Sequence, residues 1–110
     1  MDRTRLDAEG LAGEISRAYE RLTATRRELL GTTDTLSDHE RAAKVENADT
    51  LLEAKNERTA SLYLEGILDT PEHGELLSAK RRAELAHYEA RTEVEKLELL
   101  VRLLEASSRV

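Results

Sequence analysis

Hydrophobic and polar residues alternate along most of the chain with the spacing of amphipathic helices. In residues 3–30, apolar or small residues recur at alternating intervals of three and four positions, which is typical of a heptad seam. This seam consists of Ala8, Leu11, Ile15, Ala18, Leu22, Thr25 and Leu29. The pattern predicts a first helix from about Arg3 to Leu30.

A joint between helices is predicted at residues 31–36. Gly31 is suited to the position that follows a helix, and the four residues after it favour turns. Ser37 and Glu40 then have the spacing of a capping box, which begins a new helix. Because the seam spacing also continues from Thr32 to Leu36, one long helix through this joint is the alternative.

A second helical segment is predicted from Asp38 to about Leu68. Its apolar positions are Val45, Ala48, Leu51, Leu52, Ala60, Leu62, Leu64, Ile67 and Leu68. The polar residues 55–58 interrupt this stripe, and a polar layer inside the helix would lower stability while fixing its register.

The strongest boundary in the chain lies at residues 69–72. Proline disfavours a helical residue before it and is common at the first helical position, so Thr70 is the expected N-cap and Pro71 begins a third helix. That helix is predicted to end near Ala106. Its seam consists of Leu76, Lys80, Ala83, His87, Ala90, Val94, Leu97, Val101 and Leu104.

These elements predict an all-α protein. The short turn near residues 69–74 makes the second and third helices antiparallel neighbours. We therefore expect a coiled-coil-like helical hairpin in residues 37–110, and an N-terminal helix with its joint in residues 1–36. In this arrangement Leu100, Leu103 and Leu104 lie near residues 41–48.

The leucine-rich end of the third helix is wider than one seam, so it needs more than one partner helix. Closed two-fold assembly is the commonest solution for such a surface. We expect a homo-oligomer, most simply a dimer that forms a helical bundle. The predicted interface residues are Leu11, Ile15, Leu22, Leu29, Val94, Leu97, Leu100, Val101 and Leu104.

Composition supports the helical interpretation and excludes several classes. Ala, Glu, Lys, Leu and Arg make up about 61% of the 110 residues, a level typical of coiled coils and long helices. The chain has no Cys, which excludes disulfide scaffolds and cysteine-based zinc sites. No apolar run approaches the length of a membrane-spanning helix, and no signal peptide opens the chain. We therefore expect a cytoplasmic protein without membrane contact.

The net charge of −6 is unevenly distributed. Residues 37–69 carry four basic and eight acidic side chains, so this segment suits a basic protein partner better than a phosphate backbone. The basic run at residues 80–82 has Glu75 and Glu84 nearby on the same helix, which favours a solvated charged face. Nucleic-acid contact is the less favoured alternative.

Candidate chemistry is sparse. Glu84 and His87 have the Glu-x-x-His spacing of ferritin-like metal bundles, and Glu53 could supply a further carboxylate in a dimer. Among so many glutamates this spacing arises easily by chance. His39 and His73 are each expected in the first turn of a helix. Because no nucleophile–base pair or glycine-rich phosphate loop is present, we predict no catalytic residue, no cofactor and no resident metal.

The C-terminal half resembles a group of small uncharacterised helical proteins of bacteriophage and prophage genomes. The resemblance is carried by residues 55–58, a short apolar stretch to Leu68, the joint at 69–73 and the long helix after it, and it covers about residues 54–106. It implies a phage-type accessory protein that acts in the host cytoplasm on a host factor, or with replication and recombination proteins. It implies no catalytic residues.

The sequence thus favours a non-enzymatic protein–protein interaction or assembly module, in which seam residues pair helices with a partner. An accessory role in nucleic-acid transactions is the first alternative. A ferritin-like metal-binding dimer is the second.

Overall fold

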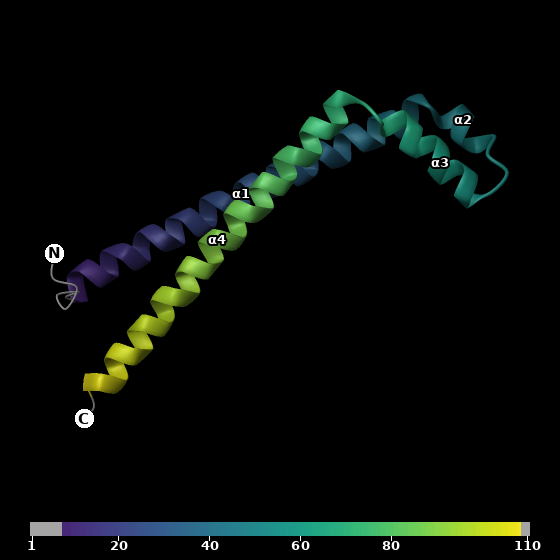
Figure 1. Ribbon diagram of the computed structural model, residues 1–110. Coiled ribbons are helices and arrows are strands. Elements are labelled where there is room, and N and C mark those ends of the chain that lie inside the picture. The colour runs from purple at the N-terminus through teal and green to yellow at the C-terminus, as the bar shows by residue number, and fades with distance from the viewer. Residues whose placement is uncertain (1–7, 109–110) are drawn as a thin grey trace. The chain divides into compact units, whose positions relative to one another are not determined.

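The computed structural model describes residues 8–108, and all the regular elements in that range are α-helices. They are α1 (Ala8–Glu46), α2 (Ala48–Leu52), α3 (Glu57–Leu68) and α4 (Pro71–Ser108), shown in Figure 1. The long helix α1 packs against the long helix α4, so the predicted all-α helical hairpin is confirmed. The predicted start near Arg3 lies outside the described residues.

Two compact units divide the chain. Among the described residues, the first unit combines residues 8–28 with residues 83–108, and the second is formed by residues 29–82. In the first unit, the N-terminal part of α1 lies antiparallel to the C-terminal part of α4. The second unit contains the remaining parts of these two helices together with α2 and α3, which lie side by side (Figure 1). The predicted division after residue 36 falls inside α1.

The predicted break at residues 31–36 is wrong, and the alternative of one long helix is correct. Gly31 has no positive φ, and Ser37 lies inside α1 instead of capping a helix. Thr32 and Thr35 donate hydroxyl hydrogen bonds to the carbonyls of Leu29 and Gly31, so they continue the helical turn. The continued seam also buries Leu36, which is 6% exposed and offsets the roughly 1 kcal/mol cost of a helical glycine.

The predicted second helix is divided into three pieces. Its first residues complete α1, which ends at Glu46, and Asn47 then separates α1 from α2. The polar stretch at residues 55–58 is a helix start rather than a polar layer. Asn56 is the N-cap of α3, and its side chain accepts a hydrogen bond from the backbone N–H of Thr59 at 2.9 Å.

The boundary predicted at Thr70 and Pro71 is correct. The Thr70 hydroxyl accepts a hydrogen bond from the backbone N–H of His73 at 3.2 Å, as an N-cap does. α4 continues to Ser108, slightly beyond the predicted end. Its partner in the hairpin is α1, because α1 is continuous and the segment expected as the partner is broken at residues 47 and 53–56.

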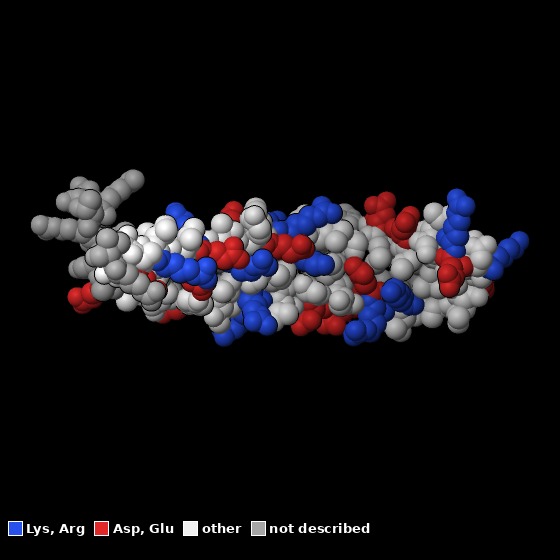
Figure 2. All heavy atoms as spheres, turned by 90° about the horizontal axis from the view of Figure 1, so that it is seen from below, with Lys and Arg blue, Asp and Glu red and all other residues white. Residues whose placement is uncertain are grey.

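The described residues include no helix that is both long enough and apolar enough to cross a membrane. Charged side chains of both signs are interspersed along the face shown in Figure 2, without a wide area of one sign. Arg81 and Arg82 are exposed, whereas Lys80 is half-buried at the position its seam spacing predicts.

Candidate functional site

The seam of the first unit is apolar and tightly packed. Its buried cluster consists of Leu11, Ala18, Val94 and Leu97, and Ile15, Leu22, Leu100 and Val101 pack against it. Seven of the nine predicted interface residues therefore lie in or against this internal cluster. Leu100 packs here and not near residues 41–48, because the N-terminal part of α1 is the segment that pairs with this end of α4.

The two other predicted interface residues lie outside this cluster. Leu29 is half-buried in the second unit. Leu104 is 43% exposed, and the neighbouring Leu103 is 57% exposed. The C-terminal end of α4 thus keeps apolar surface that the internal cluster does not cover. The side chain of Ala8, predicted in the same seam, lies outside the described residues.

Polar residues occupy seam positions at heptad intervals on both helices. They are Thr25, Thr32 and His39 on α1, and His73, Lys80 and His87 on α4. In the first unit, Thr25 Oγ1 lies 3.4 Å from His87 Nδ1. In the second unit, the His39 and His73 rings stack with centroids 5.8 Å apart. All three histidines of the chain thus face the opposite helix from the seam.

The stacked histidines form a four-residue cluster, which we call the histidine junction: His39, Glu40, Glu72 and His73. His73 Nε2 lies 3.3 Å from Glu40 Oε1, and His39 Nδ1 lies 3.8 Å from Glu72 Oε1. Each helix therefore contributes one imidazole and one carboxylate, and each imidazole contacts the carboxylate of the other helix. These contacts are ion pairs only when the histidines are protonated.

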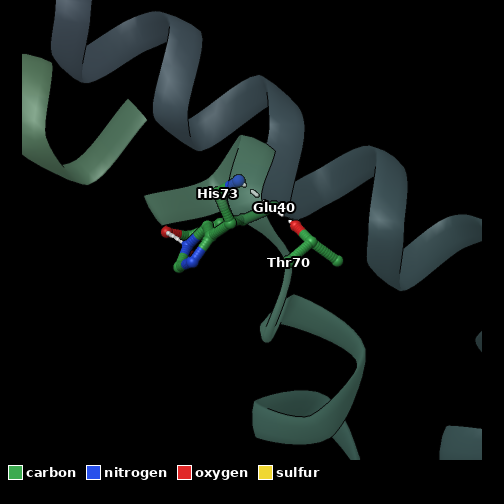
Figure 3. A network of polar contacts seen from close by, with 3 residues as sticks. All are labelled: Glu40, Thr70 and His73. Carbon is green, nitrogen blue, oxygen red and sulfur yellow. Dashed lines mark hydrogen bonds and ion pairs between the residues drawn. The ribbon is translucent and has the colours of Figure 1, made fainter. Parts of the chain in front are cut away.

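The N-cap of α4 positions one half of the junction. Figure 3 shows His73 between Glu40 of α1 and the loop that carries Thr70. The cap hydrogen bond fixes the first turn of α4, and with it the direction of the His73 side chain. Sequence reasoning placed both histidines in first turns of helices and missed the junction. Continuing the seam spacing from Leu36 to His39, and backward from Leu76 to His73, would have found it.

The predicted metal candidates were expected to meet in a dimer, so their pairing stays a prediction, and the single chain shows only their separate surroundings. Glu84 is exposed, and His87 is half-buried and faces Thr25 in the first unit. Glu53 belongs to the second unit, at the C-cap of α2. Within residues 8–108, no group of three or more potential ligand side chains is arranged to hold a metal ion.

The first unit also has one polar contact at the rim of its seam. The Tyr19 hydroxyl donates a hydrogen bond to the carboxylate of Glu98. This hydrogen bond raises the pKa of Tyr19 above its ordinary value of 10.0, and desolvation and the negative charge of Glu98 act in the same direction. The contact joins α1 to α4 from the solvent side.

The outward faces of the two long helices differ in the first unit. On α1, the positions opposite the seam are Gly13, Glu20 and Arg27. On α4, the exposed face opposite the seam carries large apolar side chains, with Thr92, Glu95 and Lys96 between them. We call its uncharged residues the outer stripe: Leu85, Tyr88, Thr92, Leu99, Leu103 and Ala106. The exposed fractions of Leu85, Leu99 and Leu103 are 59%, 53% and 57%, and that of Tyr88 is 63%.

The second unit has a shallow surface hollow beside the histidine junction. It has a volume of about 540 Å³ and is lined by Leu62, Glu65, Gly66, Leu68, Asp69 and His73. Its lining mixes apolar side chains with two carboxylates and contains no nucleophile. The arrangement is that of an open surface depression between helices and differs from the enclosed apolar pocket of a typical small-molecule site.

No family model, no curated protein and no solved structure matches the chain.

Proposed function

We propose that the protein is a non-enzymatic protein–protein interaction or assembly module that acts in the cytoplasm. The observation that supports this proposal is the outer stripe of α4. Its large apolar side chains Leu85, Tyr88, Leu99 and Leu103 are 53–63% exposed on one face of the helix, and exposed apolar patches mark interaction sites. Helix-in-groove or helix-pairing contacts are the recognition modes that such a helix face fits.

The position of the seam residues refines the sequence-based hypothesis. Helix pairing was expected to use residues such as Leu11 and Leu97, but these side chains pack against each other inside one chain. The proposed binding surface is therefore the opposite face of α4. The acidic segment of residues 37–69 is proposed as a secondary surface for a basic partner, because its eight carboxylates exceed its four cations.

Site-specific photo-cross-linking in the cells that express this protein tests the proposal. A photoreactive residue in place of Leu99 should capture protein, either another molecule of this chain or a different one. The same residue in place of Glu20, on the outward face of α1, is the matched control and should capture much less. Equal capture at the two positions, or none at Leu99, would contradict an interaction function for the outer stripe.

A further inference from the structure

We propose that the histidine junction is a pH-sensitive switch that stabilises the pairing of α1 with α4 as the pH falls. All four of its side chains belong to the second unit, and each long helix contributes two of them. Histidine is the side chain that ordinarily gains or loses its proton between about pH 5 and pH 8. The junction therefore changes its charge in the physiological range. This proposal does not depend on the outer stripe.

Each contact of the junction joins the two helices. His73 of α4 meets Glu40 of α1 at 3.3 Å, and the His73 side chain is 14% exposed (Figure 3). His39 of α1 meets Glu72 of α4 at 3.8 Å, and the His39 side chain is 22% exposed. Because partly buried charges are screened less than open ones, protonation converts both contacts into ion pairs between the helices. The pair with Glu40 is the stronger, because Glu72 is 75% exposed whereas Glu40 is 34% exposed.

The balance of charges allows both imidazoles to be protonated together. Their rings stack with centroids 5.8 Å apart, so two imidazolium ions would repel each other. Each ring nitrogen lies closer than this to a carboxylate of the opposite helix. Since Coulomb energy falls with distance, two attractions at short range outweigh the single repulsion. At higher pH the same carboxylates face neutral rings, and this attraction between the helices is lost.

The charges on the other elements around His73 also favour the protonated form. Glu65 of α3 and Asp69, the C-cap of α3, line the same surface hollow as His73. Neither carboxylate has an ion-pair partner among residues 8–108. On α1, the positive charge of Arg41 is engaged by Asp38 at 3.4 Å. The surroundings therefore add negative charge on the side of the junction that faces α3.

The third histidine provides a comparison within the same seam. His87 lies two heptads after His73 on α4, but its Nδ1 faces the hydroxyl of Thr25 at 3.4 Å. A hydroxyl offers no opposite charge to an imidazolium ion, so protonation of His87 creates no ion pair with Thr25. A response to pH is therefore expected from the junction and not from every histidine of the seam.

Thermal unfolding of the full chain at pH 7.5 and at pH 5.5 tests the proposal. A group that binds its proton more readily in the folded chain stabilises the fold at low pH, and this contribution is lost as the pH rises. His39→Asn with His73→Asn should therefore lower Tm by about 4 °C more at pH 5.5 than at pH 7.5, because asparagine is polar but takes up no proton. Comparison with the wild type at each pH cancels the response of carboxylates elsewhere.

Two further variants identify the source of the response. Glu40→Gln keeps the size of the side chain, and it should remove at least half of the pH-dependent stabilisation. His87→Asn is the matched control and should change Tm equally at both pH values. An equal loss of Tm at pH 5.5 and pH 7.5 in the double asparagine variant overturns the proposal. A full pH response in Glu40→Gln, or a response of the same size in His87→Asn, also overturns it.

Amide hydrogen exchange of the wild-type chain gives a second measurement that needs no variant. After correction for the intrinsic effect of pH on exchange, protection of the first turns of α4 should be greater at pH 5.5 than at pH 7.5. Equal corrected protection at the two pH values would show that the junction does not respond to protonation.

Discussion

The two compact units use the same two helices to build opposite kinds of seam. In the first unit, the buried side chains are all apolar, and they include Leu11, Val94 and Leu97. In the second unit, Leu36 is the only buried hydrophobic residue among those described, and His39 and His73 of the histidine junction occupy neighbouring seam positions. A heptad pattern therefore predicts which residues face the partner helix, and the residue types at those positions then decide whether the seam is apolar or polar.

The difference indicates that the two units contribute differently to the stability and to the register of the hairpin. Apolar burial contributes about 25 cal/mol per Å² and does not depend on direction, so the first unit supplies most of the stability. Polar seam contacts contribute less energy but require specific partners, so they select one register. We expect the second unit to determine the register in which α1 and α4 pair. We expect the first unit to contribute most of the free energy of unfolding.

The largest expected loss of stability follows from truncating a side chain in the apolar seam. Leu97→Ala should lower the free energy of unfolding by about 2–5 kcal/mol, because it leaves a cavity beside Val94 and Leu11. His73→Ala in the polar seam should lower it less, by about 1–2 kcal/mol, because it removes one part-buried contact with Glu40 and the stacking on His39. Urea unfolding of both variants measures the contrast, and equal losses would show that the two seams do not differ in energy.

A smaller effect is expected when the polar seam is made apolar. His39→Leu with His73→Leu should raise the free energy of unfolding by about 1 kcal/mol, which corresponds to a rise in Tm of about 4 °C or more. The gain is possible because Glu72 and Glu40 are 75% and 34% exposed and can still be hydrated after the imidazoles are removed.

Thermal unfolding followed by circular dichroism measures this change, with His39→Asn and His73→Asn as the polar control. A lower Tm for the leucine variant would show that the histidine junction contributes more to stability than apolar packing at the same positions.

The smallest expected effect concerns the rim of the apolar seam. Glu98→Gln should lower the pKa of Tyr19 toward its ordinary value, because the charged acceptor that holds the hydroxyl proton is replaced by a neutral one. A raised pKa in the folded chain means that the contact stabilises it below pH 10.0 and is lost as the pH rises through the raised pKa. Tyrosinate absorbance in a Tyr63→Phe, Tyr88→Phe background measures it. An unchanged midpoint would argue that Glu98 does not hold the proton.

Much of the fold could be predicted from periodicity and capping chemistry. The seam residues Ala83, Ala90, Val94 and Leu97 of α4 are buried as their spacing predicts, and Thr70 caps the helix that Pro71 begins. Local signals were wrong where packing overrides them. Gly31 and the Ser37–Glu40 pair resemble a helix end and a helix start, but the burial of Leu36 favours a continuous helix.

The candidate site was less predictable, for a different physical reason. The histidine junction could not be predicted because the sequence indicated that the second and third expected helices pair with each other. His39 meets His73 only when α1 is continuous and antiparallel to α4. The outer stripe was visible in the sequence as Leu85, Leu99 and Leu103, but excess leucine alone does not tell an inner face from an outer one. That distinction required the partner of α4 to be known.

The N-cap at Thr70 also lies where we expect folding of the hairpin to begin. Contacts near it join residues close in sequence: Glu40 and His73 are 33 positions apart, Thr25 and His87 are 62, and Tyr19 and Glu98 are 79. Since the entropy lost on closing a loop grows with its length, the junction closes first and the distant apolar contacts follow. His73→Ala should therefore slow refolding, whereas Leu97→Ala should mainly accelerate unfolding, and stopped-flow kinetics in urea separate the two. We therefore expect the part of the seam that contributes least to equilibrium stability to control the folding rate.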